Sequence, residues 1–165
     1  MRIDSSAPTR IDLAGGTYDI WPLYLFHTTA QTINAAISLR ARCALTSRDD
    51  GRVVLVSDDT GERVEAAGPD ALEVEQLPLV ARLVRHFGAR GLEVRTKSDS
   101  PVGAGIAGSS AMNVALTAAL ARWTGQSLTD EQLLTVAMNV EAQVIRVPTG
   151  VQDYRPALYG GVSAV

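Results

Sequence analysis

Between residues 101 and 111 the chain places three glycines and two serines after a predicted strand and before a predicted helix. Gly103, Gly105 and Gly108 allow positive φ angles and a close approach of the backbone to a ligand. A helix that begins near Ser109 presents free N–H groups and the positive end of its dipole, which together suit a phosphate group. A tight turn with a serine N-cap would use the same residues, so this segment alone leaves both interpretations open.

Two common nucleotide-binding motifs do not describe this turn. It lacks the Gly-Lys-Ser/Thr ending of a Walker A loop. Its glycines fit the letters of Gly-x-Gly-x-x-Gly, but the dinucleotide-binding form of that motif opens a chain of alternating strands and helices. Because the sequence shows no such alternation, we expect neither a P-loop fold nor a Rossmann fold.

Alternating and β-branched segments predict strands in the first two thirds of the chain. The predicted strands are residues 10–13, 32–46, 53–56 and 91–96. The sequence Asp49-Asp50-Gly51 offers a turn, so we expect the second and third of these strands to form a hairpin.

Helical patterns dominate the rest of the chain. Apolar residues between 77 and 84 have helical spacing, and Gly88 ends that segment. Residues 111–123 are rich in Ala, Val and Leu and predict a buried helix, and a capping box at Thr129 starts another that runs to about Ile145. With a last strand at 159–165, the sequence predicts an α+β domain, a mixed sheet with two packed helices on one side.

Composition and charge argue against several classes of function. The net charge is −3, and basic residues are scattered among acidic ones, so no nucleic-acid partner is expected. Apolar stretches are too short to span a membrane, and the N-terminus lacks the apolar region of a signal peptide. Cys43 is the single cysteine, so we expect a cytoplasmic protein without an internal disulfide. With two distant histidines besides it, a zinc site is not expected.

A second informative segment is residues 7–19, Ala-Pro-Thr-Arg-Ile-Asp-Leu-Ala-Gly-Gly-Thr-Tyr-Asp. A strand here carries Arg10 to one end of the sheet, and the glycine pair then turns the chain. Asp19 follows as a carboxylate that can accept hydrogen bonds from sugar hydroxyls. The plain alternatives are a structural arginine in a surface ion pair at position 10 and a turn residue at Asp19.

A third segment follows the last predicted helix. Glu141 shares one face of that helix with Leu134, Met138 and Ile145, and a carboxylate in an apolar stripe is costly unless it is paired or binds a metal. Residues 148–154 then read Pro-Thr-Gly-Val-Gln-Asp-Tyr, before Tyr-Gly-Gly. Taken alone, Glu141 could be a surface carboxylate and Asp153 a turn residue.

In order and spacing, these three segments resemble the GHMP kinases, that is, the galacto-, homoserine, mevalonate and phosphomevalonate kinases. The turn is similar to their phosphate-binding motif Pro-x-Gly-x-Gly-Leu-x-Ser-Ser-Ala, with Ile106 for leucine and one extra residue before the serines. The Ala-Gly-Gly and Gln-Asp-Tyr forms are similar to the branch that contains heptose-phosphate and fucose kinases. The resemblance extends from Ala7 to Gly161 and implies the fold of the family's N-terminal domain.

The resemblance also implies ATP and Mg²⁺ as cofactors and a sugar or sugar phosphate as the small-molecule substrate. By resemblance, the residues that bind ATP are Pro101, Gly103, Ala104, Gly105, Gly108, Ser109 and Ser110. The implied Mg²⁺ ligands are Ser110 and Glu141, with the choice between Ser109 and Ser110 left open. Asp153 would be the catalytic carboxylate and Arg10 would lie near the transferred phosphate. The implied substrate-binding residues are Gly15, Gly16, Thr17 and Asp19.

Members of this family usually carry a second domain that closes the active site. We therefore expect residues 1–165 to form the N-terminal, ATP-binding domain without the C-terminal one, with an apolar face that favours self-association or a partner subunit. A half-kinase that binds nucleotide or sugar phosphate without catalysis is the alternative. Ribosomal and translation-factor domains share the fold, but the acidic balance and the few aromatic residues argue against nucleic-acid binding.

Overall fold

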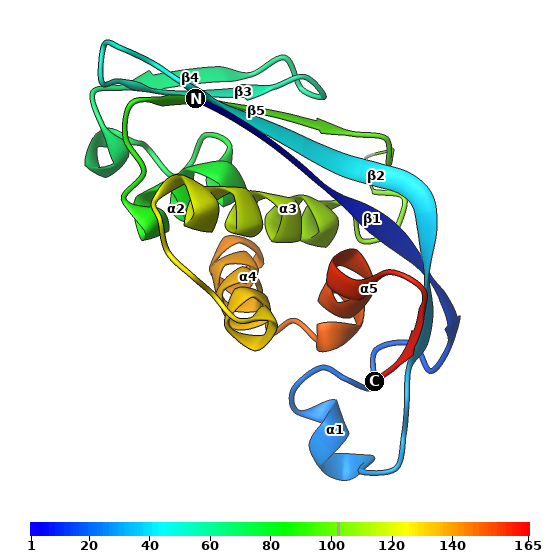
Figure 1. The fold of residues 1–165 in the computed structure, drawn as a ribbon. Helices are drawn as coiled ribbons and strands as arrows, with labels where there is room; N and C mark the ends of the chain where they lie inside the picture. Colours follow the sequence, from blue (N-terminus) through cyan, green and yellow to red (C-terminus); the bar gives the residue numbers. More distant parts are fainter. Residues whose placement is uncertain (102) are drawn as a thin grey trace.

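The structure, a computed structural model, describes residues 1–101 and 103–165. Its strands are β1 Arg2–Ala14, β2 Ile33–Ser47, β3 Val53–Ser57, β4 Arg63–Ala66, β5 Leu92–Ser98 and β6 Val162–Ala164. Its α-helices are α1 Leu23–Phe26, α2 Pro78–Phe87, α3 Gly108–Trp123, α4 Asp130–Ile145 and α5 Tyr154–Tyr159, and two short 3-10 helices are η1 Pro69–Ala71 and η2 Val151–Asp153. Figure 1 shows α2, α3, α4 and α5 on one face of a curved sheet.

The sheet is mixed, as the sequence predicts. Its strand order is β1-β2-β5-β3-β4, and the short β6 pairs with the first residues of β2, Ile33 to Ala35. β3 and β5 run parallel, whereas the other neighbours are antiparallel. The α+β prediction, with helices packed on one side of a mixed sheet, is therefore confirmed.

The predicted hairpin between the second and third strands is wrong. β5 lies between β2 and β3, and β3 instead forms a hairpin with β4, in which Val53 pairs with Ala66. The physical reason is burial: Val53, Val54 and Leu55 are fully buried, so β3 is a central strand that needs a partner on each edge. β4 was not predicted, because its four residues are too few for a clear alternation.

Both ends of the chain differ from the prediction. β1 is thirteen residues long rather than four, because it pairs with β2 from Arg2 to Ala14. A strand was expected over residues 159–165, but Tyr159 is the last residue of α5 and the strand covers only Val162–Ala164. Tyr154 and Ala157 lie three residues apart on α5, and both are buried. This spacing is that of one face of a helix, and it explains why a helix forms here before the short strand.

The three helical segments that the sequence predicts are all present. α3 begins at Gly108, three residues before the predicted start. α4 begins after Thr129, and the capping box is confirmed: the Gln132 N–H donates to Thr129 Oγ1 at 3.3 Å and the Thr129 N–H donates to Gln132 Oε1 at 2.9 Å. α2 ends at the αL residue Gly88, as predicted.

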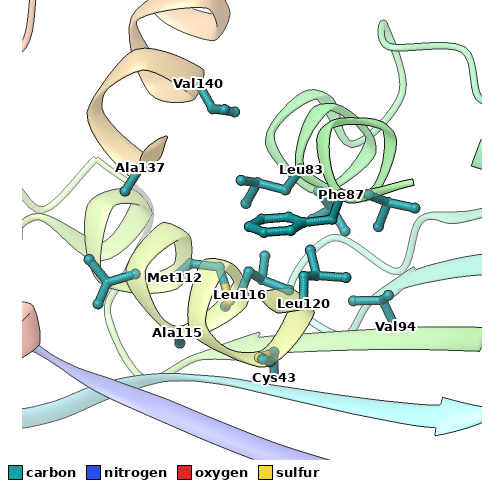
Figure 2. Packing of buried hydrophobic residues seen from close by; sticks show 14 of the residues in the cluster. Cys43, Leu83, Phe87, Val94, Met112, Ala115, Leu116, Leu120, Ala137 and Val140 are labelled. Atoms are coloured by element: carbon teal, nitrogen blue, oxygen red, sulfur yellow. The ribbon is translucent and has the colours of Figure 1, made fainter. Parts of the chain in front are cut away.

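α3 is the central helix of the core. Leu116 and Leu120 of α3 face Leu83 and Phe87 of α2, while Val94 of β5 lies on the sheet side of this cluster (Figure 2). Small residues on the sheet side of α3, among them Ala115, let the helix approach the strands closely. Because α3 is buried along most of its length from Ser110 onward, its start has a fixed place at one end of the sheet.

A different surface, around α1, is apolar and open. Trp21, Leu25 and Phe26 are more than half exposed, and so is Val162 of β6. No residue of α1 is buried.

Among the described residues, no helix combines the length and the hydropathy that a membrane crossing requires.

Candidate active site

The turn before α3 is built by left-handed backbone positions. Gly103 and Gly105 have φ angles of 76° and 70°, and Ala107 precedes the helix with a φ of 57°. Added Cβ atoms on Gly103 or Gly105 would meet nothing within 4 Å, so the space beside the turn is open. The N-cap is Ala107 and no side chain caps the helix, so the structure does not contain the alternative serine N-cap. Val102 lies outside the described residues.

β1 ties this turn to the sheet. The backbone N–H of Arg10 donates to the carbonyl oxygen of Ile106 at 3.1 Å, and its Nη1 donates to the carbonyl oxygen of Gly105 at 3.2 Å. The uncapped N–H groups at the start of α3 therefore face a cleft whose edge is fixed by a strand. This arrangement suits an anion such as a phosphate group.

Glu141 of α4 meets the serines of the turn. Its Oε1 accepts hydrogen bonds from Ser109 Oγ at 2.7 Å and from Ser110 Oγ at 3.2 Å. Its Oε2 accepts from the Tyr154 hydroxyl at 2.8 Å and, more weakly, from Asn113 Nδ2 at 3.4 Å. Glu141 is only 5% exposed, so these donors offset much of the cost of burying a charge.

Ser109, Ser110 and Glu141 form an oxygen-donor set next to the phosphate-binding turn. Magnesium prefers oxygen ligands and usually takes one or two carboxylates together with substrate phosphates. The residues present therefore fit Mg²⁺, although no group of three or more acidic, histidine or cysteine residues suited to a metal exists among the described residues. Both serine hydroxyls donate to the same oxygen, and Ser109 is the more exposed of the two.

Arg10 and Asp153 form a second pair in the same cleft. Arg10 Nε donates to Asp153 Oδ1 at 2.8 Å, Nη2 contacts the same oxygen, and Nη1 lies 3.2 Å from Asp12 Oδ2. Burial raises the pKa of the Asp153 carboxyl; the charge of Arg10 opposes this shift, and those of Glu141 and Asp19 add to it. Arg10 is 8% exposed, so the alternative of a surface ion pair is wrong.

Asp19 is bound to the backbone of Gln152, the residue before Asp153. Its Oδ2 accepts the backbone N–H of Gln152 at 2.8 Å, and its Oδ1 is buried without a partner. The side chain of Gln152 is also buried, and its Oε1 has no partner either. Burial raises the pKa of the Asp19 carboxyl, against the opposing effect of the Gln152 N–H.

Gly15 shapes the loop that leads to Asp19. It has a φ of 93°, and a Cβ there would lie 2.1 Å from the carbonyl oxygen of Gln31, so only glycine fits. Gly16 and Thr17 are more exposed than Gly15. None of the four predicted substrate-binding residues, Gly15, Gly16, Thr17 and Asp19, lines the main cleft. In this they differ from the other predicted site residues.

That cleft has a volume of about 910 Å³. All of the predicted ATP-binding, metal-binding and catalytic residues line it: Arg10, Pro101, Gly103, Ala104, Gly105, Gly108, Ser109, Ser110, Glu141 and Asp153. Its described lining contains one basic side chain, Arg10, against three acidic ones, so an ATP molecule would need a cation. Its lining also includes an apolar segment from Leu77 to Val80 at the start of α2.

A smaller cavity of about 350 Å³ lies elsewhere on the sheet and includes Asp4, Arg42 and Arg95. Its arginines are bound by acidic partners, Arg42 by Asp99 and Arg95 by Asp58. None of the predicted site residues lines it. The large cleft is therefore the candidate active site.

Sequence reasoning missed four features of this cleft. Asn113 and the hydroxyl of Tyr154 contact Glu141, Gln152 holds Asp19 through its backbone N–H, and the apolar segment lies at the start of α2. One signal was available for Asn113, which is a polar residue in the middle of an Ala/Val/Leu helix. The other contacts join segments that only the fold brings together.

Comparison with known proteins agrees with this geometry. The sequence pattern of the GHMP kinases N terminal domain matches residues 75–161, more than half of the chain. The chain belongs to the GHMP kinase family. Within this family, D-glycero-alpha-D-manno-heptose 7-phosphate kinase of Campylobacter jejuni is 33% identical over 166 residues, which cover 96% of this chain and 49% of that enzyme. A galactokinase of Thermotoga neapolitana is 26% identical over 121 residues, or 70% of this chain and 34% of that enzyme.

A solved GHMP kinase structure has the same fold. The crystal structure of a D-glycero-D-manno-heptose 1-phosphate kinase from Bacteroides thetaiotaomicron superimposes with a TM-score of 0.88 at 26% identity, covering 99% of this chain and 55% of that one. These relatives belong to the sugar and heptose-phosphate branch, as the sequence predicts. The chain spans about half the length of the two heptose-phosphate kinases and about a third of the galactokinase.

Proposed function

We propose that this chain is the ATP-binding, N-terminal domain of a sugar kinase, which transfers the γ-phosphoryl group of ATP to a hydroxyl of a sugar or sugar phosphate. The observation that carries the proposal is the meeting of three segments in one cleft. The turn before α3, Glu141 of α4, and the Arg10–Asp153 pair all line it. The sugar-kinase relatives support the choice of a sugar-type acceptor.

The protein's task in such a reaction is mainly positioning and charge stabilisation. The free N–H groups of the turn and of the first turn of α3 would bind the phosphates, and Gly103 and Gly105 let the backbone approach them. Ser109, Ser110 and Glu141 would hold Mg²⁺, which neutralises triphosphate charge when it is bound. The acidic lining of the cleft makes that charge compensation necessary.

Asp153 would orient the acceptor hydroxyl and take its proton as the new O–P bond forms and the bond to ADP breaks. Its raised pKa favours proton uptake. Arg10 holds this carboxylate in place and would offset charge on the transferring group. Next to Asp153, Gln152 lines the cleft, and its unpartnered Oε1 is an acceptor that a sugar hydroxyl would satisfy; Asp19 would act there by holding the Gln152 backbone.

The exposed apolar residues around α1 support a further part of the proposal, namely contact with another protein surface. This surface would be covered by a second copy of the chain or by a partner subunit. Sedimentation of the purified chain over a range of concentrations tests self-association. A strictly monomeric chain would remove the second-copy option.

A Mg²⁺-dependent ATP-consumption assay with D-galactose, D-mannose and heptose 7-phosphate tests the function. We expect turnover that depends on one of these acceptors. ATP binding without turnover on any acceptor would favour the non-catalytic half-kinase module. Absence of ATP binding would refute the proposal altogether.

A further inference from the structure

Tyr154 connects the two carboxylates of the candidate active site. It is the first residue of α5, its side chain is completely buried, and its hydroxyl donates to Glu141 Oε2 at 2.8 Å. The preceding residue, Asp153, accepts hydrogen bonds from Arg10. Two consecutive residues at one helix start therefore hold the Glu141 carboxylate and present the Asp153 carboxylate.

We propose that Tyr154 is a positioning residue that fixes the Glu141 carboxylate in the orientation needed to bind Mg²⁺ beside the turn. This inference rests on the proposed kinase function. It assigns a task to a tyrosine that does not line the cleft and so would not touch ATP, Mg²⁺ or the acceptor.

The hydrogen bonds around Glu141 divide between its two oxygens. Oε1 receives both serine hydroxyls and so faces the start of α3. Oε2 receives the Tyr154 hydroxyl at 2.8 Å and Asn113 Nδ2 at 3.4 Å. The same Asn113 Nδ2 lies only 2.7 Å from the carbonyl oxygen of Ala137, so Asn113 is committed mainly to α4. Tyr154 is therefore the principal donor to Oε2.

Loss of the phenol hydroxyl would leave Oε2 with only the long contact to Asn113. The carboxylate could then rotate more freely about its last side-chain bond, because only the serine hydroxyls at Oε1 would still restrain it. Residues that hold a metal ligand in place are worth roughly 10- to 100-fold in metal affinity. We expect a value near the lower limit, because the serines still contact Oε1.

The test is ATP binding by the purified chain, measured by calorimetry in EDTA and in a series of Mg²⁺ concentrations. In Tyr154→Phe, binding in EDTA should stay as in the wild type, because the ring still fills its site. The gain in ATP affinity that Mg²⁺ produces should shrink by about tenfold. Tyr159→Phe removes a hydroxyl from a half-exposed tyrosine of the same helix and should change neither quantity.

A double-mutant cycle separates positioning from packing. In a Glu141→Gln background the oriented carboxylate is absent, so adding Tyr154→Phe should cause no further loss of the Mg²⁺ effect. An equal loss in both backgrounds, or an unchanged Mg²⁺ effect in Tyr154→Phe alone, would overturn the inference and leave the kinase proposal intact. A Tyr154→Phe chain that also loses ATP binding in EDTA would assign Tyr154 to the fold and overturn it as well. A wild-type chain without any Mg²⁺ effect would refute both the inference and the proposed metal site.

Discussion

Gly150 allows Asp19 to reach the backbone of Gln152. A Cβ atom at position 150 would lie 2.0 Å from Oδ2, 2.3 Å from Cγ and 2.6 Å from Oδ1 of Asp19. The φ and ψ angles of Gly150 are −96° and 170°, which alanine adopts without strain. Gly150→Ala therefore perturbs one contact, the packing of the Asp19 carboxylate against the backbone, and not the turn itself.

The size of the effect follows from the hydrogen bond that must break. An ordinary contact needs at least 3.4 Å, so the carboxylate would have to move by more than 1 Å, which its 2.8 Å bond from the Gln152 N–H does not permit. A hydrogen bond to a charged group contributes about 1.5–3 kcal/mol. We expect Gly150→Ala to lower the free energy of unfolding by about 2 kcal/mol or more.

Urea unfolding measures this change in the free energy of unfolding. The four chains compared are the wild type, Gly150→Ala, Asp19→Ala and the double variant. In the Asp19→Ala background the carboxylate is absent, so the added methyl group should cost little. Gly68→Ala is the matched control, because its Cβ would meet only the end of the exposed Arg90 side chain. Equal costs of Gly150→Ala with and without Asp19 would refute the reasoning.

Two further predictions concern the carboxylates of the site. Asp153→Asn should lower phosphoryl transfer by at least about a hundredfold while ATP affinity stays largely unchanged, measured by coupled turnover and by calorimetry; near-normal turnover would remove Asp153 from the catalytic role. The folded pKa of Asp19 is raised above 3.8, so the folded chain binds more protons there, and this group's contribution to stability falls as pH rises from 3.8 through the folded pKa. The unfolding free energy of Asp19→Asn, relative to the wild type, should therefore be higher at pH 7 than at pH 4; a difference that does not change with pH would contradict the burial of this carboxyl.

The motif-bearing elements of the fold could be predicted from sequence. The turn before α3 and the capping box of α4 are local, because each depends on residues within one or two helical turns. Pairing between strands is not local. Nothing in the sequence near Val53 indicates that β5, about forty residues later, inserts beside it. The predicted hairpin failed because the turn residues at 49–51 suit a reversal of the chain but do not choose the strand's partner.

The candidate site shows the same limit at the level of side chains. The meeting of Ser110, Glu141 and Asp153 in one cleft was expected from resemblance alone, and the structure brings them together. The Tyr154 hydroxyl and the Gln152 N–H could not be predicted, because the sequence indicates a strand over residues 159–165 and gives no signal for the helix α5 at Tyr154–Tyr159. Their partners are thirteen and more than a hundred residues away in sequence.

The central claim is that a triphosphate lies against the turn before α3, with Mg²⁺ between its serines and Glu141. A backbone amide NMR spectrum of the chain, recorded with and without ATP and Mg²⁺, tests it most directly. The account predicts that the largest shifts fall on residues 103–110 and around Glu141, and that the Mg²⁺-dependent part is confined to Ser109, Ser110 and Glu141. Shifts gathered instead around Arg42 and Arg95 on the sheet, or no shifts at all, would contradict it.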